Sequence, residues 1–106
     1  MDTLLAIFRA LGDPSRLRIL MLVRGLDLAV GEIARVLQQS QPRVSRHLRI
    51  LAEAGLVERV KEGAWVFVRL GPAAVTAPVL AAVDALAGSD LAASDRERLA
   101  VVRAER

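Results

Sequence analysis

The sequence of 106 residues predicts a mainly α-helical fold that carries one small β-hairpin. Apolar residues recur at helical spacing over most of the chain, and only 3% of the residues are aromatic. Residues 55–70 instead alternate around a Glu-Gly-Ala turn and are enriched in Val, Trp and Phe, as in two paired strands. Together these patterns predict four helices, a hairpin, a fifth helix and a charged C-terminal helix, within a chain of single-domain length.

The first two helices are predicted from apolar periodicity and from a capping pair. Residues 3–11 place Leu and Phe side chains at helical spacing. Asp13 followed by Pro14 is a favourable N-cap and first-turn pair, so a second helix should begin there and stop near Gly25. The segment 25–30 is expected to be a connector to the next helix.

Two further helices are predicted on either side of a tight turn. Gly31–Leu37 forms a short helix, and a Gln-Gln-Ser turn follows it. Ser40 is a suitable N-cap for the next helix, which should run to about Ala54 and end at Gly55. A short helix, a turn and a second helix make a helix-turn-helix, and the hairpin that follows directly would form a wing.

The last third of the chain is predicted to hold an apolar helix and a charged one. The apolar stretch from Pro72 is Ala-, Leu- and Val-rich, and Pro78 either kinks this helix or marks where its main body begins. Ser94–Glu97 is a capping-box pattern that opens the charged helix. We therefore expect a winged helix-turn-helix and dimerisation domain over residues 1–88 and a charged helical tail over residues 89–106.

The helix that begins after Ser40 has the composition of a DNA-binding element. Residues 40–51 hold three arginines, the only histidine and no acidic residue. On a helical wheel the apolar side chains of Val44, Leu48 and Leu51 form one stripe, which is expected to be buried. The arginines lie on the opposite face, from which they could pair with phosphate or guanine edges. The residues expected to contact DNA are Ser40, Gln41, Arg43, Ser45, Arg46, His47 and Arg49, with Arg59 and Lys61 of the hairpin.

Each of these residues also has a structural interpretation. An arginine face is often only solvated surface, and Arg35 could be either a phosphate contact or a plain surface cation. Arg69 could join the hairpin cations, whereas Glu62 at the wing tip argues against phosphate contact there. Trp65 is expected to pack in the core or within the hairpin rather than to serve as a stacking platform.

Composition limits the other classes of function. Residues 1–70 hold 11 basic and 7 acidic side chains, so the positive charge lies where it could meet phosphate. With no Cys and a single His there is no nucleophile or general-base pair, so we expect no enzyme. No apolar run reaches membrane-spanning length and the N-terminus lacks a basic signal-peptide region, so a cytoplasmic location is the expectation. A non-specific or architectural DNA-binding protein and a winged-helix protein-interaction module remain alternatives.

Three motifs in this order are similar to those of the ArsR/SmtB-type winged helix-turn-helix repressors of bacteria. The motifs are Asp13-Pro14-x-Arg16, Gln41-x-x-x-Ser45-x-His47-Leu48 and Ala54-Gly55-Leu56-Val57. The resemblance extends from Leu11 to Leu70. It implies a homodimer that binds a promoter inverted repeat in double-stranded DNA and leaves when an effector arrives, with the first and last helices forming the dimer interface.

The apolar stretch after Pro72 agrees with that implied dimer. Asp84 is its only charge up to residue 87, and a helix that is apolar all round must be covered on all sides. A second copy could cover it through a two-fold contact, although the helix could also lie flat on its own domain. The expected interface residues are Leu4, Leu5, Phe8, Val79, Leu80, Val83 and Leu86.

The sequence departs from the metal-sensing members of that family. Soft ions need thiolates, which a chain without Cys lacks, and Asp84, Asp90 and Asp95 are too sparse to suggest another metal site. We therefore expect a thiol-free member with no metal and no cofactor. Its effector would be a non-metal small molecule, a partner protein or phosphorylation, unless it has none. The tail resembles the entry to a methyltransferase domain fused to some relatives, which would make S-adenosylhomocysteine or S-adenosylmethionine an effector. Alternatively the tail is a last exposed helix whose Leu99 and Val102 pack lightly on the dimer.

Overall fold

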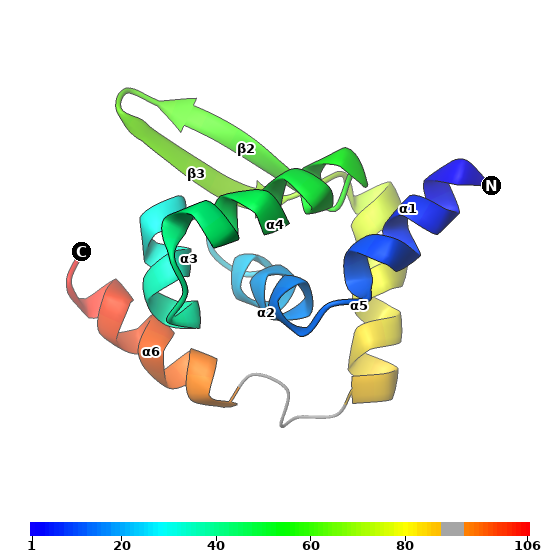
Figure 1. The fold of residues 1–106 in the computed structure, drawn as a ribbon. Helices are drawn as coiled ribbons and strands as arrows, with labels where there is room; N and C mark the ends of the chain where they lie inside the picture. Colours follow the sequence, from blue (N-terminus) through cyan, green and yellow to red (C-terminus); the bar gives the residue numbers. More distant parts are fainter. Residues whose placement is uncertain (88–92) are drawn as a thin grey trace.

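The computed structural model describes residues 1–87 and 93–106 (Figure 1). The elements within these residues are α1 (Asp2–Leu11), α2 (Pro14–Val23), β1 (Leu28–Ala29), α3 (Val30–Leu37), α4 (Gln41–Glu53), β2 (Val57–Glu62), β3 (Trp65–Leu70), α5 (Ala73–Ala87) and α6 (Ala93–Ala104). The predicted fold class and the order of its helices and hairpin are confirmed. Pro78 lies inside α5, which continues on both sides of it.

The wing is a regular antiparallel hairpin that packs beside a third, very short strand. Strands β2 and β3 pair from Val57 opposite Leu70 to Glu62 opposite Trp65. The segment predicted as a plain connector contains β1, whose Leu28 lies opposite Val68. The expectation of only two strands was therefore wrong, because a strand of two residues is too short to show alternation in the sequence.

The ends of the helices follow from local capping chemistry. The Asp13 carboxylate accepts hydrogen bonds from the backbone amides of Ser15 and Arg16 at 2.8 and 3.2 Å, as an N-cap should. Gln38 closes α3 with a left-handed backbone (φ 57°), which turns the chain toward α4. At the other end of α4, Gly55 has φ 77°, a conformation that favours glycine.

One close backbone approach sets the wing against the end of α4. The Gly71 amide donates a hydrogen bond of 2.9 Å to the carbonyl oxygen of Leu56. A Cβ atom at position 71 would lie only 2.2 Å from the carbonyl oxygen of Gly55. Only glycine therefore allows the returning strand to pass so close to the turn after α4.

The core is aliphatic and lies around α2, which the other elements surround in Figure 1. Burying this apolar surface is the main stabilising term for so small a domain. Its largest fully buried side chains are Ile19, Leu20, Leu28, Ile33, Leu48, Leu51 and Leu56. The stripe predicted for α4 is confirmed, because Val44, Leu48 and Leu51 are at most 1% exposed.

Helix α6 packs on the same core, against α3 and α2. Val102 is only 3% exposed and belongs to the core of the single chain, so the expectation that it packs only lightly was wrong. The helix begins at Ala93, one residue before Ser94. The proposed division between residues 88 and 89 and the side chain of Asp90 lie outside the described residues, and that division stays a prediction.

Candidate nucleic-acid interface

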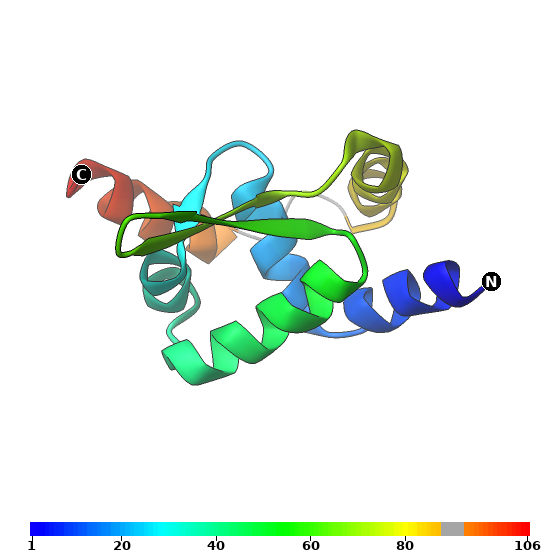
Figure 2. The ribbon, with the colours of Figure 1, turned by 90° about the horizontal axis from the view of Figure 1, so that it is seen from above.

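Helix α4 presents a face of exposed arginines opposite its buried stripe. Arg43, Arg46 and Arg49 are exposed, as is Ser45 between them. Across residues 1–87 and 93–106, no carboxylate forms an ion pair with any of these three arginines. In Figure 2 the helix lies along one edge of the molecule, beside the hairpin. This face therefore carries positive charge that the described part of the protein leaves unneutralised.

The N-terminal end of α4 is also exposed. The Ser40 hydroxyl accepts a hydrogen bond from the Arg43 amide at 3.4 Å, which confirms Ser40 as the N-cap. Gln41 is exposed in the first turn, and its amide lies beside Gly31 of α3. The positive end of the helix dipole favours a phosphate at such a position.

His47 lies differently from the arginines of the same helix. It is half-buried, and its Nδ1 atom is 3.3 Å from the Nη1 atom of Arg16 on α2. Arg16 is itself held by a hydrogen bond of 2.6 Å from its Nε atom to the carbonyl oxygen of Ala10. Burial and the nearby arginines lower the pKa of His47, against the opposing effect of Asp13. His47 is therefore favoured as the neutral imidazole, and its contact with DNA stays a prediction.

The hairpin adds cations along its edge strand. Arg59 and Lys61 are exposed on β2, which pairs on one side only. Because side chains alternate along a strand, these two cations share one face and Glu58 and Glu62 the other. The cationic face could meet a DNA backbone without the carboxylates facing it.

Two other arginines that the sequence offered as possible phosphate contacts form ion pairs within the protein. Arg35 forms an ion pair of 2.5 Å with Glu105 on α6, which favours its interpretation as a surface cation. Arg69 lies 3.9 Å from the carboxylate of Asp27, near the start of β1. Both pairs are exposed and could exchange for phosphate, but neither arginine belongs to the free face of α4.

Trp65 does not lie in the core, which was one of its two sequence interpretations, and its packing within the hairpin stays a prediction. It is 63% exposed and therefore not a core residue. The register places it opposite Glu62, at the last pair before the turn of the hairpin. Ile50, by contrast, is partly buried against the core, which accounts for an apolar residue among the arginines.

A second surface lies between α1 and α5, which form an apolar groove of about 690 Å³. Several of the predicted interface side chains line it and are strongly exposed, with Phe8 at 63% and Leu86 at 87%. The lining includes Leu4, Phe8, Val79, Val83 and Leu86. Leu5 is 42% exposed on α1 and Leu80 packs partly on the core, but neither lines the groove.

The described residues offer neither a metal cluster nor a membrane span. Within them, no three His, Asp or Glu side chains gather closely enough to hold a metal ion. None of the described helices is both long and apolar enough to cross a bilayer.

These features define a winged helix-turn-helix regulator, and comparison with known proteins identifies its family. Residues 13–59 match the family described as "Bacterial regulatory protein, arsR family". The arsenical resistance operon repressor of Escherichia coli K12 is 45% identical over 67 residues, which are 62% of this chain and 57% of the repressor. The uncharacterized HTH-type transcriptional regulator MJ1325 of Methanocaldococcus jannaschii is 47% identical over 62 residues, 58% of this chain and 70% of that protein.

A solved structure agrees with these sequence relatives. The homodimeric winged helix-turn-helix DNA-binding domain of Mb0332 from Mycobacterium bovis, described as a possible ArsR-family regulator, superposes with a TM-score of 0.74. It is 30% identical, and the match covers 81% of this chain and 79% of that domain. The present chain therefore belongs to the arsR family of bacterial regulators, as the sequence motifs predicted.

Proposed function

We propose that this protein is a dimeric transcriptional repressor that binds an inverted repeat in duplex DNA and is released by a non-metal effector. The observation that carries the proposal is the exposed face of Arg43, Arg46 and Arg49, which no carboxylate in the described residues neutralises. Phosphates and guanine edges are the complementary groups for such a face. The wing cations Arg59 and Lys61 add phosphate contacts that position the helix.

The groove between α1 and α5 supports the proposed dimer. Exposed Phe8 and Leu86 would be covered by the same surface of a second copy, which is the simplest closed arrangement. The related Mb0332 domain is described as homodimeric. Two copies would present two recognition helices to two half-sites, as an inverted repeat requires.

The effector is proposed to differ from that of the arsenical repressor. The match between this chain and that repressor spans only 57% of the repressor's length. Arsenite and other soft ions are bound through thiolates, and the present sequence has no cysteine. An effector of another chemical class would therefore have to act on this protein.

Fluorescence anisotropy with the duplex upstream of the protein's own gene tests the proposal. Its affinity should exceed that for a shuffled duplex by about a thousandfold or more, and both affinities should fall with added salt because counterions are released. Equal, steeply salt-dependent affinities would instead support a non-specific DNA-binding protein. No binding even at low salt would overturn the DNA-binding proposal and favour a protein-interaction module.

A further inference from the structure

A second pocket lies where the wing, β1, α3, α6 and the start of α4 converge. It has a volume of about 650 Å³, within the range typical of sites for small organic ligands. Ala29, Phe67 and Val102 supply apolar lining, and Trp65 stands beside them. Gln41 closes the end toward α4. This apolar pocket thus borders two parts of the candidate DNA interface, the wing and α4.

The charges around the pocket are balanced in pairs. Arg106 donates two hydrogen bonds to the Glu32 carboxylate, at 2.8 and 2.5 Å, and Arg35 pairs with Glu105. Glu32 is held further by the Ala29 amide at 2.9 Å. The hydrogen bond from Arg106 lowers the pKa of Glu32 despite its partial burial, so this carboxylate stays charged at neutral pH. An anionic ligand would have to displace a carboxylate from these arginines, whereas an uncharged ligand would leave both pairs intact.

Trp65 indicates the shape of the ligand. It is the only tryptophan in the chain, it is 63% exposed, and it borders a cavity whose lining is mainly apolar. A large exposed aromatic side chain at the edge of a pocket gains most from a flat partner that stacks on it and removes both surfaces from water. The amide of Gln41 could hydrogen-bond to one polar atom at the edge of such a molecule.

We propose that this pocket binds an uncharged, planar aromatic molecule, and that its occupation weakens DNA binding through Gln41 and the wing. The inference deepens the proposed function, because it names the chemical class and the place of the effector. It rests on that function only for the effect on DNA. The ligand affinity itself can be measured without DNA, so the two proposals can fail separately.

The first measurement uses the uncharged fluorophore N-phenyl-1-naphthylamine, with the anionic 8-anilino-1-naphthalenesulfonate for comparison. The uncharged probe should bind the wild-type protein more tightly and should quench Trp65 emission. Trp65→Ala removes the stacking surface, and Gly31→Leu fills the end of the pocket beside Gln41. Each variant should bind the uncharged probe about tenfold more weakly.

Gly25→Leu is the matched control for Gly31→Leu. Gly25 lies outside the pocket, and a Cβ atom there meets nothing within 4 Å. This variant should bind the probe as the wild type does, and circular dichroism should show that all the variants are folded. Equal probe affinity in all four proteins, tighter binding of the anionic probe, or no binding of the uncharged one would overturn the pocket assignment.

The second measurement adds the operator duplex. The uncharged probe should lower operator affinity, and the operator should lower probe affinity by the same factor, since coupling between two sites is reciprocal. Probe binding with the expected mutational pattern but unchanged operator affinity would overturn the effector role. If the protein shows no operator preference even without the probe, the proposed function fails while the pocket assignment is still decided by the DNA-free titrations.

Discussion

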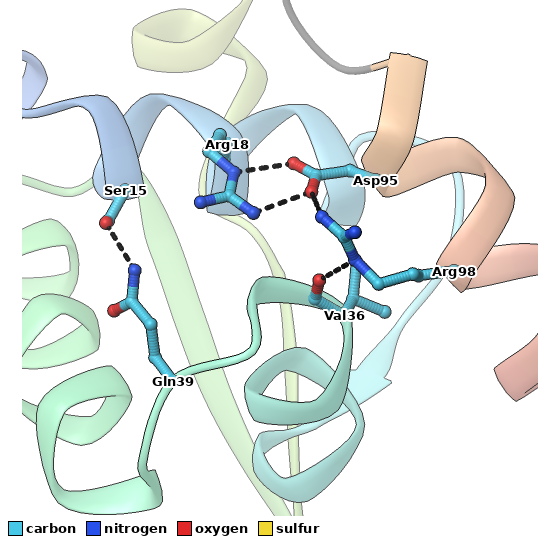
Figure 3. Close-up of polar contacts among 6 residues, drawn as sticks. All are labelled: Ser15, Arg18, Val36, Gln39, Asp95 and Arg98. Atoms are coloured by element: carbon cyan, nitrogen blue, oxygen red, sulfur yellow. Dashed lines mark hydrogen bonds and ion pairs between the residues drawn. The ribbon is translucent and has the colours of Figure 1, made fainter.

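Arg18 on α2 and Asp95 on α6, 77 positions apart in the sequence, form a two-pronged ion pair. The Nε and Nη2 atoms of Arg18 donate to the two carboxylate oxygens at 2.8 and 2.7 Å (Figure 3). Arg98 donates to the same carboxylate at 3.0 Å and to the carbonyl oxygen of Val36 at 2.6 Å. This network ties α6 to both helices beneath it, and so holds the wall of the second pocket that α6 provides.

Asp95→Asn should destabilise the protein. Asp95 is 3% exposed, and its pKa is lowered because its two arginine partners outweigh the opposing effect of burial. Removing its charge leaves two guanidinium groups unbalanced, at a cost of about 2–4 kcal/mol in the free energy of unfolding at neutral pH. In wild type this contribution is present above pH 3.8 and lost as the pH falls through the lowered pKa. Urea denaturation measures it.

The control for this variant is Asp84→Asn. Asp84 also forms a two-pronged pair, with Arg24, but it is 55% exposed. Its replacement should lower the free energy of unfolding far less than Asp95→Asn does, because water and salt screen solvent-exposed pairs. Equal losses in the two variants would contradict the anchoring role of Asp95.

His47 should make the protein less stable in mild acid. Its pKa in the folded protein lies below the ordinary 6.5, so below pH 6.5 the unfolded chain binds more protons than the folded one. The free energy of unfolding should therefore fall as the pH drops from 6.5 through the lowered pKa. His47→Gln should lose less stability than wild type over this range in denaturation series. Parallel pH profiles for the two proteins would show that His47 is not buried as described.

Arg46→Ala should weaken operator binding by about 1–3 kcal/mol if Arg46 contacts a base. Replacing an arginine that contacts only phosphate would instead weaken binding to all duplexes alike, and it would reduce the salt dependence of that binding. Arg103→Ala is the matched control, because Arg103 is exposed on α6, outside the candidate interface. Anisotropy titrations of operator and shuffled duplex distinguish these outcomes. Unchanged affinity of Arg46→Ala for both would remove Arg46 from the DNA-binding set.

Leu86→Asp should dissociate the dimer, and operator binding should be lost with it. Leu86 is 87% exposed in the single chain and lines the α1–α5 groove, so a charge there can be solvated in the monomer but not in the covered interface. Light scattering should report a monomer with the wild-type circular dichroism spectrum. Ala85→Asp carries the same charge on the neighbouring exposed position outside the groove lining and should remain dimeric. A Leu86→Asp dimer of wild-type stability would place the interface elsewhere.

Much of the candidate interface could be predicted from the sequence because it depends on one helix. The wheel placed Val44 and Leu48 in the core and Arg46 outside, and the structure agrees. Side-chain direction within a helix is set by the 3.6-residue period, which needs no tertiary information. The N-caps at Asp13 and Ser40 were predictable for the same reason, since their bonds join residues two or three positions apart.

The second pocket could not be predicted in this way. Its lining comes from β1, α3, the wing and α6, and the exposure of Trp65 depends on the register of a strand pair. Gln39 illustrates the same limit on a smaller scale. Its amide nitrogen donates to the Ser15 hydroxyl at 2.7 Å, across 24 positions in the sequence (Figure 3). No local pattern marks either residue of such a pair.

The sequence by itself determined the helices, their caps, the hairpin and the family, because these depend on periodicity, on neighbouring side chains and on motifs of fixed spacing. Only the tertiary structure decided that β1 completes the sheet, that His47 lies against Arg16, and that Asp95 anchors α6. The physical reason is that these contacts join segments far apart in the chain. Their formation depends on how the whole core packs, which no single stretch of residues specifies.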